Sequence, residues 1–291
     1  MKNLIPVIAI LTAFSSTSVM AGRCSATKTI EEELSMQGVS LLKVNVLAGY
    51  LEITPSTDKA IHFSGRACSD EEEWLQRMTL DVERNDQILE LTVIIPYNDT
   101  DFDADYAYMD IDLKIPANLP TEIRDSSGDI STEKVSITSI DDSSGNIRVR
   151  DNNTSLIIQD SSGRIEVREL RGDLEITDSS GDIDVNDVKG KVTIPRDSSG
   201  DIDIETVTGT VVVGRDGSGD IDIQDVKSDV EIGSDGSGSI NIQDVEGSVT
   251  IGSDGSGTVN VANISGDLLI EAKGSGNVRT HGVKGEISLP R

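Results

Sequence analysis

The sequence predicts an all-β protein whose larger part is a parallel β-solenoid, and three observations carry this prediction. A short phrase, Asp-Ser-Ser-Gly or Asp-Gly-Ser-Gly, begins at Asp125 and returns every 17 to 19 residues as far as Asp254. Isoleucine and valine keep a fixed register to the glycine that ends each phrase, with the two-residue spacing of β-strands. No aromatic residue occurs from Asp125 onwards, which suits a thin core of aliphatic side chains. Fixed periods of this length are typical of repeat architectures.

The phrase occurs in nine copies, of which the last is decayed. The ninth begins at Lys273, and the other eight begin at Asp125, Asp142, Asp160, Asp178, Asp197, Asp216, Asp235 and Asp254. Each copy carries two short β-branched strands and two glycine-containing corners, where Asp or Ser can hydrogen-bond the turn backbone. The strands could form an antiparallel meander or stack in parallel. Near-identity of corresponding positions favours stacking, since one unit cannot bury its apolar side alone. We expect about nine coils of 17–19 residues over residues 121–291.

Two segments precede the repeats. Residues 1–21 have the features of a secretory signal peptide, because Lys2 precedes an apolar run that ends in small residues at Ala21. Residues 22–120 hold all the aromatic residues outside that leader and several alternating segments, and they predict an irregular β-rich cap that covers the open end of the solenoid. We therefore expect a protein exported to the periplasm or the cell surface of a bacterium.

The two cysteines fit this location. In an oxidising compartment Cys24 and Cys68 are expected to form a disulfide, with free thiols as the alternative. Only two histidines occur, which leaves little room for histidine-based catalysis or a multi-histidine metal site. There is no Cys-x-x-Cys, so zinc ribbons and thioredoxin-like redox motifs are excluded.

The charge balance restricts the partners. The chain has 52 acidic and 25 basic residues and a formal net charge of −27, which argues against nucleic acid or anionic lipid as a partner. No stretch after the leader approaches the 18 or so apolar residues that a membrane span needs.

Six aspartates form the first candidate cation site. Alternation with inward-pointing isoleucines places them on the outer face of three stacked coils, at Asp182, Asp184, Asp201, Asp203, Asp220 and Asp222. Stacked neighbours about 4.8 Å apart repel each other by about 1 kcal/mol in water. Such a grid could bind calcium, or it could be a solvated face that keeps the rod soluble. Crowding is also expected to raise the pKa of these carboxyl groups, so that mild acidification increases stability.

A second acidic cluster resembles an EF-hand loop. Asp99, Asp101, Asp103 and Asp110 match positions 1, 3, 5 and 12 of such a loop. Ala104 stands where the loop needs glycine, and Asp110 replaces the usual glutamate. The alternative is an acidic surface loop.

The repeats resemble a bacterial family of exported "putative adhesin" domains of unknown function. The most specific likeness is Ser-Gly-Asp-Ile at 127–130, 180–183, 199–202 and 218–221. The stretches 42–46, 49–53 and 112–116 are similar to the strands that precede the family's repeats, so that the likeness covers roughly residues 40–291. The resemblance implies a β-solenoid with a role at the surface or envelope, and it implies no catalytic residues.

Taken together, these features predict a non-enzymatic, exported β-solenoid that acts as an adhesin, an envelope scaffold or a binding module without a cofactor. Its partner would be an envelope or surface protein or a glycan. The first alternative is a calcium-dependent binding module. The second is a polysaccharide-acting enzyme, which would need two carboxylates in unlike environments, whereas a ladder provides like ones. Self-association through the last coil, which ends at 288–291, is a further expectation.

Overall fold

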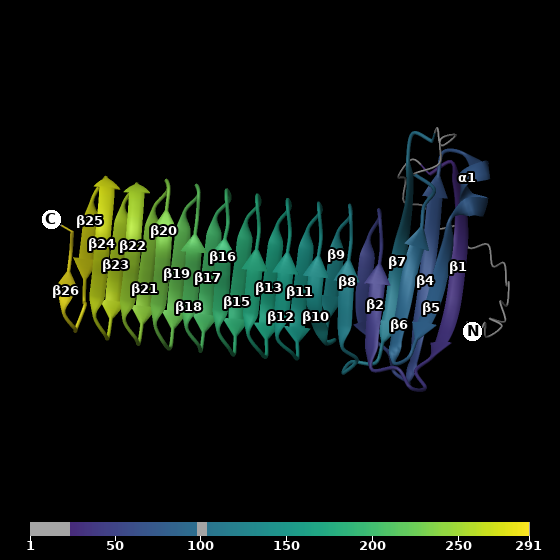
Figure 1. Ribbon diagram of the computed structural model, residues 1–291, viewed down its shortest axis with the longest axis horizontal. Coiled ribbons are helices and arrows are strands. Elements are labelled where there is room, and N and C mark those ends of the chain that lie inside the picture. Colours follow the sequence, from purple (N-terminus) through teal and green to yellow (C-terminus); the bar gives the residue numbers. More distant parts are fainter. Residues whose placement is uncertain (1–23, 98–103, 291) are drawn as a thin grey trace.

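The structure is a computed structural model that describes residues 24–97 and 104–290, so the predicted leader at 1–21 lies outside the described residues. The chain forms a rod of two stacked sheets with a wider cap at its N-terminal end (Figure 1). Each sheet contains 13 strands. The predicted architecture, an all-β solenoid of about nine coils preceded by an irregular β-rich region, is confirmed.

The N-terminal elements form the cap. They are β1 (Ala26–Ser35), β2 (Leu41–Asn45), β3 (Leu51–Pro55), β4 (Ala60–Ser69), α1 (Glu72–Arg77), β5 (Thr79–Asn85), β6 (Ile88–Ile94) and β7 (Ala107–Ile115). Three pairings here are antiparallel: β1 with β4, β4 with β7, and β5 with β6. β2 and β3 are parallel to their neighbours and lie between the β6–β7 coil and the rod. The stacking order of the coils therefore differs from their order in the chain.

The rod has two strands per coil, one in each sheet. The first sheet continues from β3 through β9 (Ile130–Glu133), β11 (Ile147–Asn152), β13 (Ile165–Leu170), β15 (Ile183–Val188), β17 (Ile202–Val207), β19 (Ile221–Val226), β21 (Ile240–Val245), β23 (Val259–Ile264) and β25 (Val278–His281). The second sheet continues from β2 through β8 (Thr121–Arg124), β10 (Ile137–Asp141), β12 (Leu156–Gln159), β14 (Leu174–Thr177), β16 (Val192–Arg196), β18 (Val211–Arg215), β20 (Val230–Asp235), β22 (Val249–Ser256), β24 (Leu268–Ser275) and β26 (Ile287–Ser288).

The core is a single aliphatic layer between the two sheets. Parallel register places each isoleucine on its equivalent in the next coil, as Ile183 lies on Ile202 and Ile202 on Ile221. All three side chains are fully buried. The cap fills its wider interior with larger groups, including Phe63 and Trp74. No Phe, Trp or Tyr occurs from Asp125 onwards, so aromatic side chains fill the interior of the cap and not that of the repeats.

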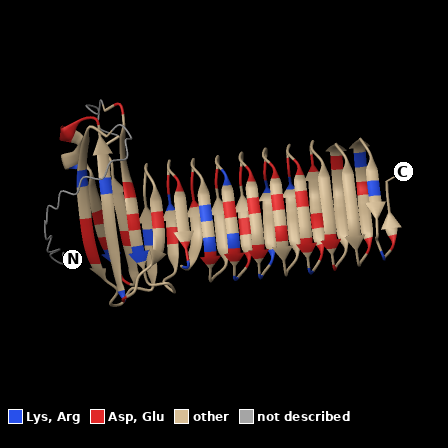
Figure 2. Cartoon of the chain, turned by 180° about the vertical axis from the view of Figure 1, so that it is seen from behind, with Lys and Arg blue, Asp and Glu red and all other residues tan. Residues whose placement is uncertain are grey.

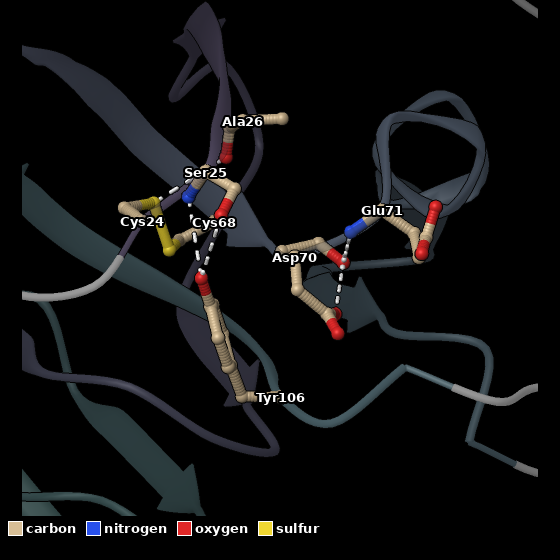
Figure 3. The surroundings of a disulfide bond; sticks show 8 residues. Cys24, Ser25, Ala26, Cys68, Asp70, Glu71 and Tyr106 are labelled. Carbon is tan, nitrogen blue, oxygen red and sulfur yellow. Dashed lines mark hydrogen bonds between the residues drawn. A yellow bond between two sulfur atoms is a disulfide. The ribbon is translucent and has the colours of Figure 1, made fainter.

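The predicted disulfide between Cys24 and Cys68 is confirmed, with 5.7 Å between the two Cα atoms. It joins the start of β1 to the end of β4, and the Ser25 amide donates a hydrogen bond to the Tyr106 hydroxyl beside it (Figure 3). Closing a loop with a sequence separation of 44 residues stabilises the fold by about 4 kcal/mol on the chain-entropy account. Among the described residues, no helix is long and apolar enough to cross a membrane.

A column of glycines lets the coils approach each other at one corner. Gly219 has a φ of +139°, and a Cβ atom added to it would lie 1.8 Å from the carbonyl oxygen of Gly200 in the preceding coil. Its own amide donates to the carbonyl of Ser237 in the following coil. A side chain at this position would both strain the backbone and push two coils apart.

We expect Gly219→Ala to lower the free energy of unfolding by more than about 2 kcal/mol, because an alanine pays the strain of the φ angle and forces the backbone of Gly200 to move. Chemical denaturation followed by far-UV circular dichroism measures the loss. Ser218→Ala, at the exposed neighbouring position, is the matched control and should change stability by less than about 0.5 kcal/mol. Equal effects of the two variants would contradict the steric account.

Candidate functional site

The six aspartates predicted to form an outer grid lie together on the outward side of the first sheet. Parallel pairing places Asp184 on Asp203, and Asp203 on Asp222. The other three occupy the corner just before the same strands and are exposed: Asp182, Asp201 and Asp220. Acidic bands on successive strands of the rod mark this face in Figure 2. The structure thus brings the six side chains together on one surface.

Three of these carboxylates have a structural use. The amide of Asp220 donates to Asp201 Oδ1 at 2.9 Å, and the amide of Ser239 donates to Asp220 Oδ1 at 2.7 Å. The amide of Asp201 donates to Asp182 Oδ1 at 3.3 Å in the same way. Each carboxylate therefore binds the backbone of the next coil.

Asp203, in the middle of the stacked row, has a raised pKa. Burial is the larger cause, and the negative charges of Asp222 and Asp184 add to it.

The second predicted acidic site lies mostly outside the described residues, since Asp99, Asp101 and Asp103 belong to that part of the chain. Its fourth member, Asp110, lies on β7, where Oδ1 accepts a hydrogen bond from the Tyr50 amide at 3.1 Å. Among the residues that the structure describes, no three His, Cys, Asp or Glu side chains are placed to hold a metal ion. Calcium binding at either cluster stays a prediction.

A further set of carboxyl groups lies inside the rod, and sequence reasoning missed its burial. The aspartate that opens each repeat phrase is only 1–6% exposed in all eight copies. As predicted, it hydrogen-bonds the turn: Asp178 Oδ1, for example, accepts from the amides of Ser179 at 2.6 Å and Ser180 at 3.3 Å. The other oxygen, Oδ2, is buried without a hydrogen-bond partner in Asp125, Asp142, Asp160, Asp178 and Asp197. We call these eight residues the interior aspartate column.

The column ends on a cation. Lys273 takes the aspartate position in the ninth copy, directly on Asp254 in the parallel register. Its ammonium group forms an ion pair with Asp254 Oδ2 and donates to the carbonyls of Gly257 and Ser275, both at 3.0 Å. Only 6% of the lysine side chain is exposed. This single positive charge stabilises the last aspartate of the column.

The remaining members lack such a partner, and their pKa values move accordingly. Burial raises the pKa of Asp125, Asp142, Asp160 and Asp235 to about 6 and that of Asp216 to about 7. Neighbouring carboxylates add to the shift, as Asp197 and Asp235 do for Asp216. A buried carboxyl group without a second hydrogen bond is less costly when it is neutral. These five members of the interior aspartate column therefore take up protons at mildly acidic pH.

Comparison of the sequence with protein families and with curated proteins gives no match. Solved structures give weak similarities. One is a putative cell adhesion protein from Clostridium sporogenes, 15% identical with a TM-score of 0.38, covering 69% of this chain and all of that one. A putative adhesin from Bacteroides fragilis is 14% identical with a TM-score of 0.29, covering 92% and 99%. A putative lipid binding protein from Parabacteroides distasonis is 18% identical with a TM-score of 0.31, covering 90% and 97%.

We expect the protein to be more stable near pH 5 than near pH 7.5. An unfolded aspartate has a pKa of about 3.9, so the native state with its raised pKa values binds more protons between about pH 4 and pH 7. The free energy of unfolding therefore falls as the pH rises through this window. Groups with a lowered pKa, such as Glu166, are ionised in both states above about pH 5 and add no slope. Thermal melts at constant ionic strength measure the effect.

Two variants locate its source. Asp216→Asn removes one titrating group from the interior column and should reduce the dependence of the melting temperature on pH. Asp81→Asn changes an exposed aspartate on β5 and should leave that dependence as it is. A melting temperature that rises steadily from about pH 5 to pH 7.5 would contradict the assignment, because a raised carboxyl pKa can only give the opposite slope.

The calcium prediction has its own measurement. If the outer aspartates bind calcium, millimolar calcium should raise the melting temperature by more than about 1 °C relative to chelator, since a ligand that binds only the native state stabilises it. The double variant Asp203→Asn, Asp222→Asn should lose that rise. A smaller shift in the native protein counts against a calcium site.

Proposed function

We propose that this chain is an exported, non-enzymatic binding rod that acts in adhesion or as a scaffold at the bacterial envelope. The observation that carries the proposal is the rod itself, in which a continuous parallel ladder holds two flat faces in a fixed geometry (Figure 1). Extended stacks of this kind present long binding surfaces rather than enclosed active sites. The predicted leader at 1–21 and the Cys24–Cys68 disulfide support export to an oxidising compartment.

The two ends of the rod differ. At the N-terminal end, β1 and β5 run antiparallel to their neighbours and are the outermost strands of the two sheets. At the other end the last described strands are β25 and the two-residue β26, with Ile287 and Leu289 each 44% exposed. Apolar groups beside an open sheet edge favour pairing with another strand. Self-association of the protein through this end is part of the proposal.

The non-enzymatic part of the proposal is supported by the uniformity of the acidic positions. Hydrolysis of a glycan needs one carboxyl group that holds a proton and a second that is ionised. In the outer grid, however, the corner aspartates Asp182, Asp201 and Asp220 repeat one arrangement, in which each Oδ1 accepts a backbone amide of the next coil. A polysaccharide-acting enzyme is the alternative, and release of reducing sugar ends from acidic and neutral glycans would favour it.

Deletion of the gene in its own bacterium tests the proposal. We expect the deletion strain to lose binding to surfaces or to show an envelope-stress response, because a missing adhesin or scaffold has no enzymatic substitute. Complementation with the whole chain should restore the phenotype, and complementation with a chain that lacks residues 1–21 should not. A deletion strain that is unchanged in both assays would contradict the proposed role.

A further inference from the structure

Four arginines gather on the first sheet close to the cap, although the protein as a whole is strongly acidic. Arg148 and Arg150 lie on β11, Arg168 lies on β13, and Arg164 occupies the corner before β13. The parallel register places Arg150 directly beside Arg168. Like charges at paired positions destabilise a sheet. Figure 2 shows basic bands on neighbouring strands of this part of the rod, next to the acidic bands of the following coils.

A single carboxylate organises three of these arginines. Glu166, only 8% exposed, accepts from Arg148 Nε at 3.0 Å and from Arg150 Nη2 at 2.9 Å, and it forms an ion pair with Arg168 Nε at 2.8 Å. Burial alone would raise the pKa of Glu166, but the hydrogen bonds and charges of the arginines lower it. Asp184 adds a second carboxylate, which lies 3.6 Å from Arg168 Nη2, so two acidic groups face these three guanidinium groups. About half of each of the three arginine side chains is exposed.

A hollow of about 250 Å³ lies against the cluster, and residues of the cap and of the rod share its lining. The polar and aromatic groups in it are Tyr50, Asp129, Ser131, Asn146, Arg148, Arg164 and Glu166. Tyr50 immediately precedes β3 in the cap, and 40% of it is exposed. It brings an aromatic ring to a rod whose repeats contain none.

The acidic groups of the lining are already engaged. Asp129 Oδ1 accepts from the amide of Asn146 at 2.9 Å and from its side chain at 3.0 Å, and Glu166 is held by the arginines. Arg148 uses only Nε for that bond, and its two terminal nitrogens bind none of the described residues. Arg164 donates to Asp184 through Nη2 at 3.3 Å and forms a longer ion pair with Asp182 through Nη1 at 4.0 Å. The hollow therefore offers guanidinium donors to an anionic ligand.

We propose that this hollow binds an acidic saccharide, with the sugar ring on Tyr50 and its carboxylate on Arg148 and Arg164. Guanidinium groups bind carboxylates through two parallel hydrogen bonds. The second side-chain N–H of Asn146, which is not needed for the bond to Asp129, and the hydroxyl of Ser131 match the hydroxyl groups of a sugar. A polyphosphate chain is a poorer ligand, because it has no ring to pack on the Tyr50 side chain in the hollow. The inference rests on the proposed binding role and names its ligand class.

Calorimetric titration of the whole protein with a galacturonate hexamer tests the inference. We expect binding that weakens with added salt, and at least tenfold weaker binding of the fully methyl-esterified hexamer, which has the same rings without the charges. Arg148→Gln and Arg164→Gln should each weaken binding of the acid about tenfold or more, in line with a lost charged hydrogen bond. Tyr50→Ala should weaken binding of both oligomers.

The matched control is Arg279→Gln. Arg279 lies on β25 in the same outward row as Arg148, many coils away, so its replacement removes one positive charge without touching the hollow. It should change the affinity by less than about twofold. Thermal melts verify that each variant is folded. Equal binding of acid and ester, or equal effects of Arg148→Gln and Arg279→Gln, would overturn the inference. No binding of the hexamer, in a protein whose deletion abolishes surface attachment, would overturn the ligand class and leave the binding role intact.

Discussion

The parallel backbone ladder is the constraint on which the rest of this structure depends. It holds equivalent residues of successive coils about 4.8 Å apart. Each side chain therefore lies next to the side chain at the same repeat position in the neighbouring coil. For isoleucine this is favourable, because Ile183, Ile202 and Ile221 exclude water from one another. For aspartate it is unfavourable, and three arrangements relieve the repulsion. Outer corner aspartates bind the amide of the next coil, interior aspartates take up protons, and the last of them meets Lys273.

The same ladder explains where the sheet edges are covered. Within the rod each coil supplies backbone partners to the next, and only the terminal coils expose unpaired groups. The cap ends the sheets in antiparallel strands and adds a short helix that contacts β1 and β4, and these elements depart from the repeat geometry. The disulfide then anchors the outermost strand, β1, to β4. The irregular end therefore breaks the parallel geometry of the stack at its N-terminal edges.

Much of the rod could be predicted from the sequence, because the period of the repeat determines both the spacing of the strands and the register in which they pair. The inward isoleucines, the corner glycines and the outer row Asp184–Asp203–Asp222 follow directly from it. Burial of the interior aspartates could not be predicted in this way, since an aspartate in a turn is normally expected to be exposed. The only signals of burial in the sequence were the recurrence of the aspartate in eight copies and its replacement by Lys273 in the ninth. The insertion of the β2–β3 coil between β6–β7 and β8–β9 was also beyond reach, because pairing across the cap involves segments without a common period.

Recognition by such a rod depends on the positions at which the copies differ. A perfect repeat would present the same surface at every coil and could not place a ligand at one of them. The outward row that begins at Ser131 runs through Arg148, Glu166, Asp184, Asp203 and Asp222 before it becomes uncharged at Asn241 and Asn260. Its charge changes sign between Arg148 and Glu166, on the second and third coils of the rod, where Tyr50 from the cap lines the same hollow. Because the ladder keeps the backbone geometry the same from coil to coil, the side chains alone produce this change of charge. The surface at the junction with the cap therefore differs from the surface of the rest of the rod.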